Sequence, residues 1–429
     1  MIRHLNKNIR TKKNKLAIIG LGYVGLPLAI EFGKKREVIG FDIKKKRIDE
    51  LKRNIDSSLE VSSSEFKKSI HLSFTDSIDD IKNCKIFIAT IPTPVNGKNK
   101  PDLSLLEECC EMIGLIIKEG DLVIFESTVY PGVTEEICMP IIEKKFKLKF
   151  NKDFFCGYSP ERINPGDKEH SISNIVKVTS GSTKKIATKV DELYKEIITA
   201  GTHMAPNIKV AEAAKVIENT QRDVNIALIN ELTMIFNKLK IDTKSVLDAA
   251  NTKWNFLPFK PGLVGGHCIG VDPYYLAYKS LEVGHKAEMI IAGRKINDGM
   301  ASFFADQIKK KMIEKKINIK KANILIMGLT FKENCPDIRN TKIVDLIKGI
   351  KKYNSKIDVY DPWAKKEDVK KKYKINLIQK LQKNKYDVII LAVAHNEFKN
   401  LTLKKIKSFG KKKYMIYDPK FLLEFKETD

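Results

Sequence analysis

A short apolar strand, a glycine-rich turn and a helix follow one another near the start of the chain. Residues 15–20 (KLAIIG) predict a buried strand that leads into the turn GLGYVG (20–25), and residues 26–35 have the pattern of a helix. A second apolar strand over 37–43 carries Asp42 near its end. This order predicts a parallel β-α-β unit, so this part of the chain is confined to an α/β fold with a doubly wound sheet.

The three glycines of this turn have separate physical roles. Gly20 makes the tight turn, Gly22 lets a pyrophosphate reach the backbone, and Gly25 lets the helix and the strand pack closely. The N-terminus of the helix offers free N–H groups and a positive dipole end to phosphates. Asp42 is placed to accept hydrogen bonds from a ribose diol, and its charge would repel a 2′-phosphate, so the turn favours NAD. Arg47, five residues further on, leaves NADP open at this point.

Threonines follow further predicted strands. The apolar runs 85–90 and 121–128 read as strands at α/β spacing, and Thr90, Thr93 and Thr128 lie at or just beyond their carboxyl ends. A doubly wound sheet presents its ligand loops at that edge. Capping of a strand end would explain any one threonine, but a shared ligand explains all of them better.

A reactive cysteine is suggested by the segment GLVGGHCIGVDPYYL (262–276). Gly265 and Gly266 allow a close approach of a ligand to the backbone, Cys268 follows them, and Asp272 could position a lysine or a water. A tight turn with a buried thiol is the competing interpretation.

A long helix is predicted over 208–238, with a broad apolar stripe that suits a connection between two α/β units and dimerisation. Lys215 and Asn219 are four residues apart on it and therefore point the same way. Residues 154–167 (FFCGYSPERINPGD) are expected to form a loop that carries Glu161 and other polar residues.

The last third of the chain predicts a second α/β unit. Its loop GLTFKENCPDIRNT (328–341) contains Lys332, Asp337 and Arg339 and lacks the glycine fingerprint, so its ligand should be held differently. Lysine-rich helices are expected to alternate with apolar strands over 322–328, 356–361, 386–393 and 414–418.

Charge and cysteine content narrow the class of protein. The net charge of +25 would suit an anionic ligand, nucleic acid or lipid, but the lysines form scattered runs such as Lys411–Lys413 without interleaved aromatics. We therefore expect solvated helix faces and no nucleic-acid partner.

Seven cysteines without a CxxC pair predict reduced thiols in a cytoplasmic protein with no metal site. The apolar run near the N-terminus carries glycines and Pro27, so neither a signal peptide nor membrane insertion is expected.

Six motifs occur in the order found in one enzyme family: GLGYVG, ESTVYPG, SPERINPG, AEAAKVIENT, GGHCIGVDP and GLTFKENCPDIRNT. From residue 15 to about residue 420 the chain resembles the UDP-glucose/UDP-N-acetylmannosamine dehydrogenases, which are nucleotide-sugar 6-dehydrogenases. The resemblance implies oxidation of a sugar CH2OH to a carboxylate with two NAD+ and one water. Cys268 would hold the intermediate first as a thiohemiacetal and then as a thioester.

The resemblance also implies a role for each matching residue. Lys215, Asn219 and Asp272 would hold the C6 oxygen and a water, and Glu161 would assist thioester hydrolysis. The implied catalytic set is Cys268, Lys215, Asn219, Asp272, Glu161 and Thr128. The implied dinucleotide site is Gly20, Gly22, Tyr23, Val24, Gly25, Asp42, Arg47, Thr93, Thr128 and Arg339. The implied substrate site is Glu161, Arg162, Asn164, Lys215, Asn219, Lys253, Phe259, Gly265, Gly266 and Lys332.

Departures from the UDP-glucose enzymes argue against glucose, and SPERINPG and GGHCIGVDPYYL resemble the branch of the family that acts on UDP-N-acetylhexosamines. Pro165 stands where those enzymes have a second glutamate, and Val271 stands where they have a lysine. UDP-N-acetylglucosamine or its galactosamine epimer is preferred, and UDP-N-acetylmannosamine or UDP-glucose is the alternative. A single-step β-hydroxyacid dehydrogenase of related fold, and a basic nucleic-acid-binding protein on an inactive dehydrogenase scaffold, are the competing classes.

The expected architecture has two Rossmann-like doubly wound domains joined by the long central helix. The predicted domains are an NAD-binding domain over 1–205, a central helical domain with the cysteine loop and dimer interface over 206–305, and a UDP-sugar-binding domain over 306–429. We expect a homodimer or a higher even oligomer.

Overall fold

The computed structural model describes residues 14–163 and 171–423, which form two compact units. The first unit runs to Glu218 and also includes Tyr274–His285, and the second contains Asn219–Pro273 and the chain from Lys286 onward. The boundary between them falls inside the helix α8 (Ile208–Leu239), which agrees with the predicted helix over 208–238. The three predicted domains remain a prediction.

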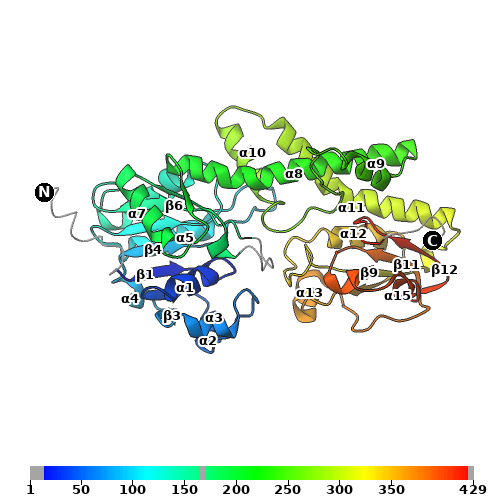
Figure 1. The fold of residues 1–429 in the computed structure, drawn as a ribbon, viewed down its shortest axis with the longest axis horizontal. Helices are drawn as coiled ribbons and strands as arrows, with labels where there is room; N and C mark the ends of the chain where they lie inside the picture. The colour runs from blue at the N-terminus through cyan, green and yellow to red at the C-terminus, as the bar shows by residue number, and fades with distance from the viewer. Residues whose placement is uncertain (1–13, 164–170, 424–429) are drawn as a thin grey trace. The chain divides into compact units, whose positions relative to one another are not determined.

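The first unit is built on an eight-stranded sheet of order β3-β2-β1-β4-β5-β6-β7-β8, parallel except where β6 meets β7 (Figure 1). The order reverses between β1 and β4, where a doubly wound sheet places its ligand. The strands are β1 (Leu16–Ile19), β2 (Val38–Phe41), β3 (Leu72–Thr75), β4 (Ile86–Ala89), β5 (Leu122–Phe125), β6 (Phe155–Tyr158), β7 (Lys177–Gly181) and β8 (Thr202–Met204).

The helices of this unit cover the sheet with apolar faces. Leu16 and Ile18 of β1 pack with α1, α2 and α7, while Ala17 between them faces the opposite side of the sheet. The helices are α1 (Gly25–Gly33), α2 (Lys45–Lys52), α3 (Ser63–Lys68), α4 (Ile78–Ile81), α5 (Ser104–Gly114), the π-helix η2 (Val133–Cys138), α6 (Met139–Phe146), the 3-10 turn η3 (Ile172–Asn174), α7 (Lys184–Lys195) and most of α10 (Asp272–Glu282).

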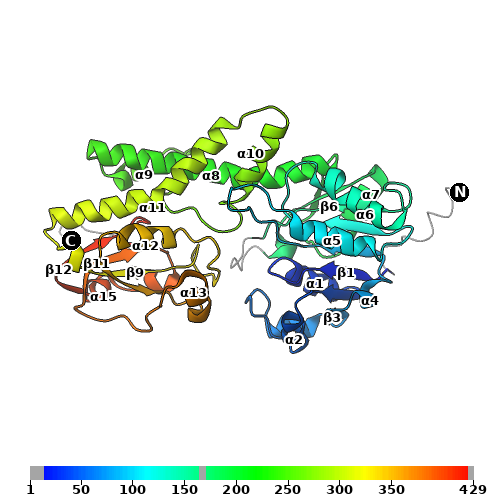
Figure 2. The same cartoon turned by 180° about the vertical axis from the view of Figure 1, so that it is seen from behind.

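The second unit contains a parallel four-stranded sheet of order β10-β9-β11-β12 with helices on both faces (Figures 1 and 2). Ile324 and Ile326 of β9 pack on α11 and α12, whereas Leu325 and Met327 pack with α14 and α15. The strands are β9 (Asn323–Met327), β10 (Lys356–Tyr360), β11 (Tyr386–Leu391) and β12 (Gly410–Tyr417). The helices are α9 (Thr243–Ala250), α11 (Glu288–Glu314), the 3-10 turn η4 (Ile319–Lys321), α12 (Ile343–Lys351), α13 (Lys366–Tyr373), α14 (Asn396–Lys399) and α15 (Leu403–Lys407).

The predicted fold class is confirmed, and two local expectations are wrong. The segment 154–167, expected to be a loop, begins with β6, whose buried residues continue the sheet. Lys411–Lys413 lie on the edge strand β12 and not on a helix. Charged side chains are tolerated there because one side of an edge strand faces solvent.

Six of the seven cysteines are buried, and Cys268 alone is partly exposed. Cys109 and Cys110 belong to α5 and are buried, as expected from the sequence. Burial raises the pKa of Cys84 to about 11 and also raises the pKa of Cys109 and of Cys156.

Candidate active site

The glycine turn of the first unit has the geometry that its sequence predicts. Gly20 has a φ of +91°, and a Cβ on Gly25 would lie 1.9 Å from the carbonyl oxygen of Gly20, so the turn tolerates no side chain there. A Cβ on Gly22 would meet nothing within 4 Å. The backbone is therefore open at the position where a pyrophosphate has to approach, and the turn fits a dinucleotide.

Asp42 and Arg47 are both tied to this turn. The Asp42 carboxylate accepts hydrogen bonds from the backbone N–H of Leu21 (2.9 Å) and of Lys44 (2.9 Å). Arg47 donates to the carbonyl of Leu21 (2.9 Å) and forms an ion pair of 2.8 Å with Asp56. Because Arg47 is already paired with a buried carboxylate, it is a poor partner for a 2′-phosphate, which favours NAD over NADP.

The threonines at the strand ends have different surroundings. The hydroxyl of Thr90 donates to the carbonyl of Gly20 (2.6 Å), so it supports the turn from within. The hydroxyl of Thr93 donates to the carbonyl of Thr128 (2.5 Å), and Tyr275 donates to the carbonyl of Thr93 (2.8 Å). A ligand shared by Thr90, Thr93 and Thr128 stays a prediction.

Glu161 follows β6 and is nearly buried. One carboxylate oxygen accepts hydrogen bonds from the backbone N–H of Arg162 (2.6 Å) and of Ile163 (2.5 Å), while the other faces Lys177 at 3.4 Å. The Arg162 guanidinium forms an ion pair with Glu218 (2.8 Å). Asn164 lies outside the described residues.

The cysteine turn of the second unit is held by buried amides. Asn230 donates to the carbonyl of Gly262 (3.0 Å) and accepts from its N–H (2.8 Å), which fixes the start of the turn. The carbonyl of Cys268 accepts the N–H of Asp272 (2.9 Å), and the Asp272 carboxylate accepts from Asn219 (2.6 Å). The structure thus brings together Asn219 and Asp272, two of the residues that the sequence assigned to one site.

The two glycines before Cys268 lie against other parts of the protein and not against open space. A Cβ on Gly265 would lie 2.5 Å from the carbonyl oxygen of Asn340, and a Cβ on Gly266, whose φ is +87°, would lie 2.6 Å from the Phe331 ring. The sequence predicted a close approach at these glycines, and the structure shows that loop 328–341 makes it. Direct contact of either glycine with a ligand stays a prediction.

A histidine and an ion pair join the same two loops. His267, next to Cys268, has Nδ1 3.3 Å from Asp337, and Arg339 forms a bidentate pair with Asp337. Burial alone would raise the pKa of Asp337, but the hydrogen bonds and charge of Arg339 outweigh it and leave that pKa lowered. The cysteine turn and loop 328–341 are therefore linked by the polar approach of His267 to Asp337 as well as by packing.

Lys332 lies at the carboxyl edge of the second sheet, where it lines a small cavity of about 20 Å3 together with Lys420. Burial lowers the pKa of Lys420. Two ammonium groups at the carboxyl ends of parallel strands suit an anionic ligand such as a diphosphate. In the same unit Lys253 is exposed and Phe259 is half-buried, and their roles stay predictions.

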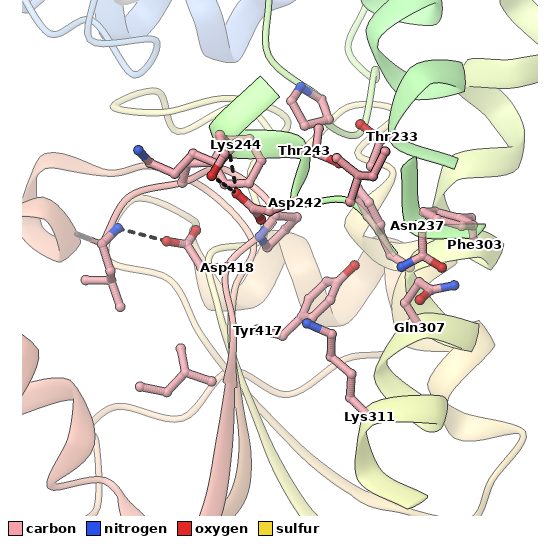
Figure 3. A pocket seen from close by; sticks show the side chains of 18 of the residues that line it. Thr233, Asn237, Asp242, Thr243, Lys244, Phe303, Gln307, Lys311, Tyr417 and Asp418 are labelled. Carbon is pink, nitrogen blue, oxygen red and sulfur yellow. Dashed lines mark hydrogen bonds between the residues drawn. The ribbon is translucent and has the colours of Figure 1, made fainter. Parts of the chain in front are cut away.

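A larger cavity of about 870 Å3 lies elsewhere in the second unit, between the ends of α8 and β12 (Figure 3). Asn237, Gln307 and Tyr417 are among its lining residues. The residues predicted to form the active site do not line this cavity. Its size alone is therefore no guide to the chemistry.

Three models of one family match the chain in succession. They describe the NAD binding domain (residues 14–198), the central domain (209–299) and the UDP binding domain (325–424) of the UDP-glucose/GDP-mannose dehydrogenases. The chain belongs to the UDP-glucose/GDP-mannose dehydrogenase family. The resemblance stated from the motifs is confirmed, and NAD is the cofactor of this family's first domain.

Relatives of this family match almost the whole chain. The UDP-N-acetyl-D-glucosamine 6-dehydrogenase of Pseudomonas aeruginosa is 58% identical over 97% of this chain and 99% of its own length. The enzyme of the same name from Salmonella typhi is 55% identical over 97% of this chain and 98% of its own length. Among solved structures, a UDP-D-ManNAc dehydrogenase from Pyrococcus horikoshii has a TM-score of 0.87 at 28% identity and covers 96% of both chains.

Sequence reasoning missed three residues that lie beside predicted site residues. Tyr275 lies inside the segment 262–276, but its residue type alone indicated no role there. No motif marked Lys420, although it stands two residues beyond the predicted strand 414–418, and that position could have pointed to it. Lys177, which faces Glu161, lies in a stretch where no motif was recognised.

Across residues 14–163 and 171–423 no group of three or more His, Cys, Asp or Glu is arranged to hold a metal ion. In the same part of the chain, no helix has the length and apolar character needed to cross a membrane.

Proposed function

We propose that this chain oxidises the C6 hydroxymethyl group of a UDP-N-acetylhexosamine, with UDP-N-acetylglucosamine preferred, to the uronic acid. The observation that carries the proposal is the partly exposed Cys268 on a turn fixed by Asn230, in a chain 58% identical to a UDP-N-acetyl-D-glucosamine 6-dehydrogenase. A single oxidation to an aldehyde needs no thiol, whereas oxidation to an acid gains from one that retains the aldehyde.

The residues of the chain would divide the work as follows. NAD+ held at the glycine turn supplies the hydride acceptor for both oxidations. Asn219 and Asp272, bonded to each other, would orient the C6 oxygen and a water that takes its hydroxyl proton as the hydride leaves, and Lys215 would stabilise the charge that develops on that oxygen. Cys268 attacks the aldehyde carbon, and Glu161 takes a proton from the water that later releases the acid.

The experiment that tests this function measures NADH to completion with NAD+ and each of four substrates. They are UDP-N-acetylglucosamine, UDP-N-acetylgalactosamine, UDP-N-acetylmannosamine and UDP-glucose. Two NADH per UDP-N-acetylglucosamine is the expected result, whereas one NADH per sugar would contradict the thioester route. Failure with all four substrates, together with salt-sensitive binding to random DNA, would favour a nucleic-acid-binding protein on an inactive scaffold.

Asp42→Ala should raise the KM for NAD+ by about 10- to 100-fold, because a charged hydrogen bond to a ribose is worth about 1.5–3 kcal/mol. Initial rates at varied NAD+ and varied sugar nucleotide measure the two KM values separately. Asp79→Ala is the matched control, because its carboxylate is exposed and forms a surface ion pair with Lys82 in the same unit. A larger rise in the KM for the sugar nucleotide would mean that the cofactor site is misassigned.

Lys332→Ala should raise the KM for the sugar nucleotide by about 10- to 100-fold with little change in the KM for NAD+, because an ammonium–phosphate contact is lost. Lys348→Ala, which removes an exposed lysine of the same unit, serves as the control in the same rate measurements. An unchanged KM in Lys332→Ala would remove this lysine from the substrate site.

We further propose that the protein works as a homodimer in the cytoplasm, where its free thiols stay reduced. Leu228, Ile235 and Leu239 recur on one face of α8 and are 52%, 44% and 60% exposed, and Trp254 of the same unit is 92% exposed. Sedimentation equilibrium should give a dimer for the native chain and a monomer for Leu228→Glu/Ile235→Glu. A native monomer would contradict the assignment.

A further inference from the structure

A buried cluster of charged and polar side chains lies behind Glu161 in the first unit. Lys177 on β7 forms an ion pair of 2.8 Å with Glu126, which follows β5, and approaches Glu161 at 3.4 Å. The hydroxyl of Tyr194 on α7 donates to the other oxygen of Glu126. The side chains of Lys177 and Glu126 are 3% and 0% exposed, so neither charge is solvated by water.

Such a cluster is costly unless each member is satisfied, because burying an ion requires removal of its hydration shell. Burial would lower the pKa of Lys177, but the charges of Glu126 and Glu161 outweigh it and raise that pKa. Burial raises the pKa of Glu126 to about 7 despite the opposing charge of Lys177. Lys177 therefore stays protonated and directs its charge at Glu161.

The geometry of Glu161 is fixed from two sides. Its Oε1 accepts two backbone N–H groups, and its Oε2 is left to Lys177. The nearby Arg162 guanidinium is engaged by Glu218 and by the carbonyl of Val176. Among the residues that the structure describes, Lys177 is therefore the cation that restricts the orientation of the Glu161 carboxylate.

We propose that Lys177, anchored by Glu126 and Tyr194, is a positioning residue for Glu161 in hydrolysis of the Cys268 thioester. The inference rests on the proposed function. In that step the oxygen of water bonds to the thioester carbon and one of its protons goes to Glu161. The carbon–sulfur bond breaks, and its electron pair leaves with the Sγ of Cys268. The Lys177 ammonium holds the carboxylate of Glu161, which accepts the proton, in one orientation.

The test uses the double variant Glu126→Gln/Lys177→Met, because Lys177→Met alone would leave Glu126 buried without a counter-charge. We expect a burst of two NADH per active site, followed by steady turnover slowed about 10- to 100-fold, the scale expected for a misplaced catalytic group. Intact-mass measurement should then find an adduct equal to the sugar nucleotide less four hydrogens. The pH profile of thioester hydrolysis should differ from that of the native enzyme, because the double variant removes both buried charges that lie behind Glu161.

Two further variants separate positioning from folding. Lys177→Arg keeps the charge and should restore most of the turnover without accumulation of the adduct. Lys85→Met removes a lysine that pairs with the buried Asp121 at 2.8 Å in the same sheet, and it should leave hydrolysis and the pH profile unchanged.

The outcomes separate failure of the role proposed for Lys177 from failure of the proposed dehydrogenase function. Wild-type hydrolysis rate and pH profile in the double variant would overturn the role of Lys177 and leave the dehydrogenase assignment intact. Equal loss of oxidation and hydrolysis, with no adduct, would also overturn it, because a purely structural defect acts on both steps. No NADH from the native enzyme with any sugar nucleotide would overturn both.

Discussion

Cys268→Ser should lower formation of the uronic acid by at least about 10³-fold while leaving the affinity for NAD+ unchanged. A serine hydroxyl is far less ionised than a thiol at neutral pH, and it would form an ester rather than a thioester, so the second oxidation and the release both fail. The first hydride transfer needs no thiol, so at most one NADH per sugar should form. Product analysis by mass spectrometry and NAD+ titration by calorimetry measure the two properties.

Cys84→Ala provides the control for loss of a thiol. Its side chain is buried in the first unit, and its removal should leave the ratio of two NADH per sugar intact. If Cys268→Ser retained full activity, the covalent mechanism would have to be abandoned. If it lost NAD+ affinity as well, the variant would have damaged more than the nucleophile.

Arg294→Met should destabilise the second unit by about 3–5 kcal/mol, the usual cost of stranding one member of a buried ion pair. Arg294 of α11 lies 2.7 Å from Asp223 of α8, and both side chains are nearly inaccessible to water. Burial already raises the pKa of Asp223, although the charge of Arg294 opposes that rise. Without the arginine, the buried Asp223 carboxylate would either lack its counter-charge or take up a proton. The network continues through Asn297 and Asn230 to Gly262, at the start of the cysteine turn.

Tryptophan fluorescence during denaturation by guanidinium chloride can follow this unit by itself. The chain has two tryptophans, Trp254 and Trp363, and both belong to the second unit. Asp223→Asn/Arg294→Met should recover much of the loss, and Lys244→Met, at an exposed pair with Asp248, should cost less than about 1 kcal/mol. A loss below about 1 kcal/mol in Arg294→Met would show that water reaches the pair.

Features encoded by neighbouring residues could be predicted from the sequence. The β-α-β unit follows from the apolar runs around the glycine turn, and the structure places β1, α1 and β2 where that pattern predicts them. The strict need for glycine at position 25 is confirmed by the 1.9 Å approach that a Cβ there would make. In β12, by contrast, Lys411–Lys413 break the apolar pattern, so the strand begins four residues earlier than predicted.

Contacts between distant parts of the chain could not be predicted in this way. Lys177 and Glu126 meet only because β7 and β5 belong to one sheet with β6 between them. The link from His267 to Asp337 depends on how two loops fold against each other, which no local period encodes. The motifs therefore located the candidate nucleophile and the glycine turn, whereas the side chains that orient them required the fold.

The uneven exposure of the cysteines gives each chain a single chemically addressable thiol. With six thiols buried, an alkylating reagent at neutral pH should modify Cys268 alone. The moles of label bound per mole of chain would then count the sites that are competent to react. In a dimer, a value of one half instead of one would reveal that the two copies react alternately.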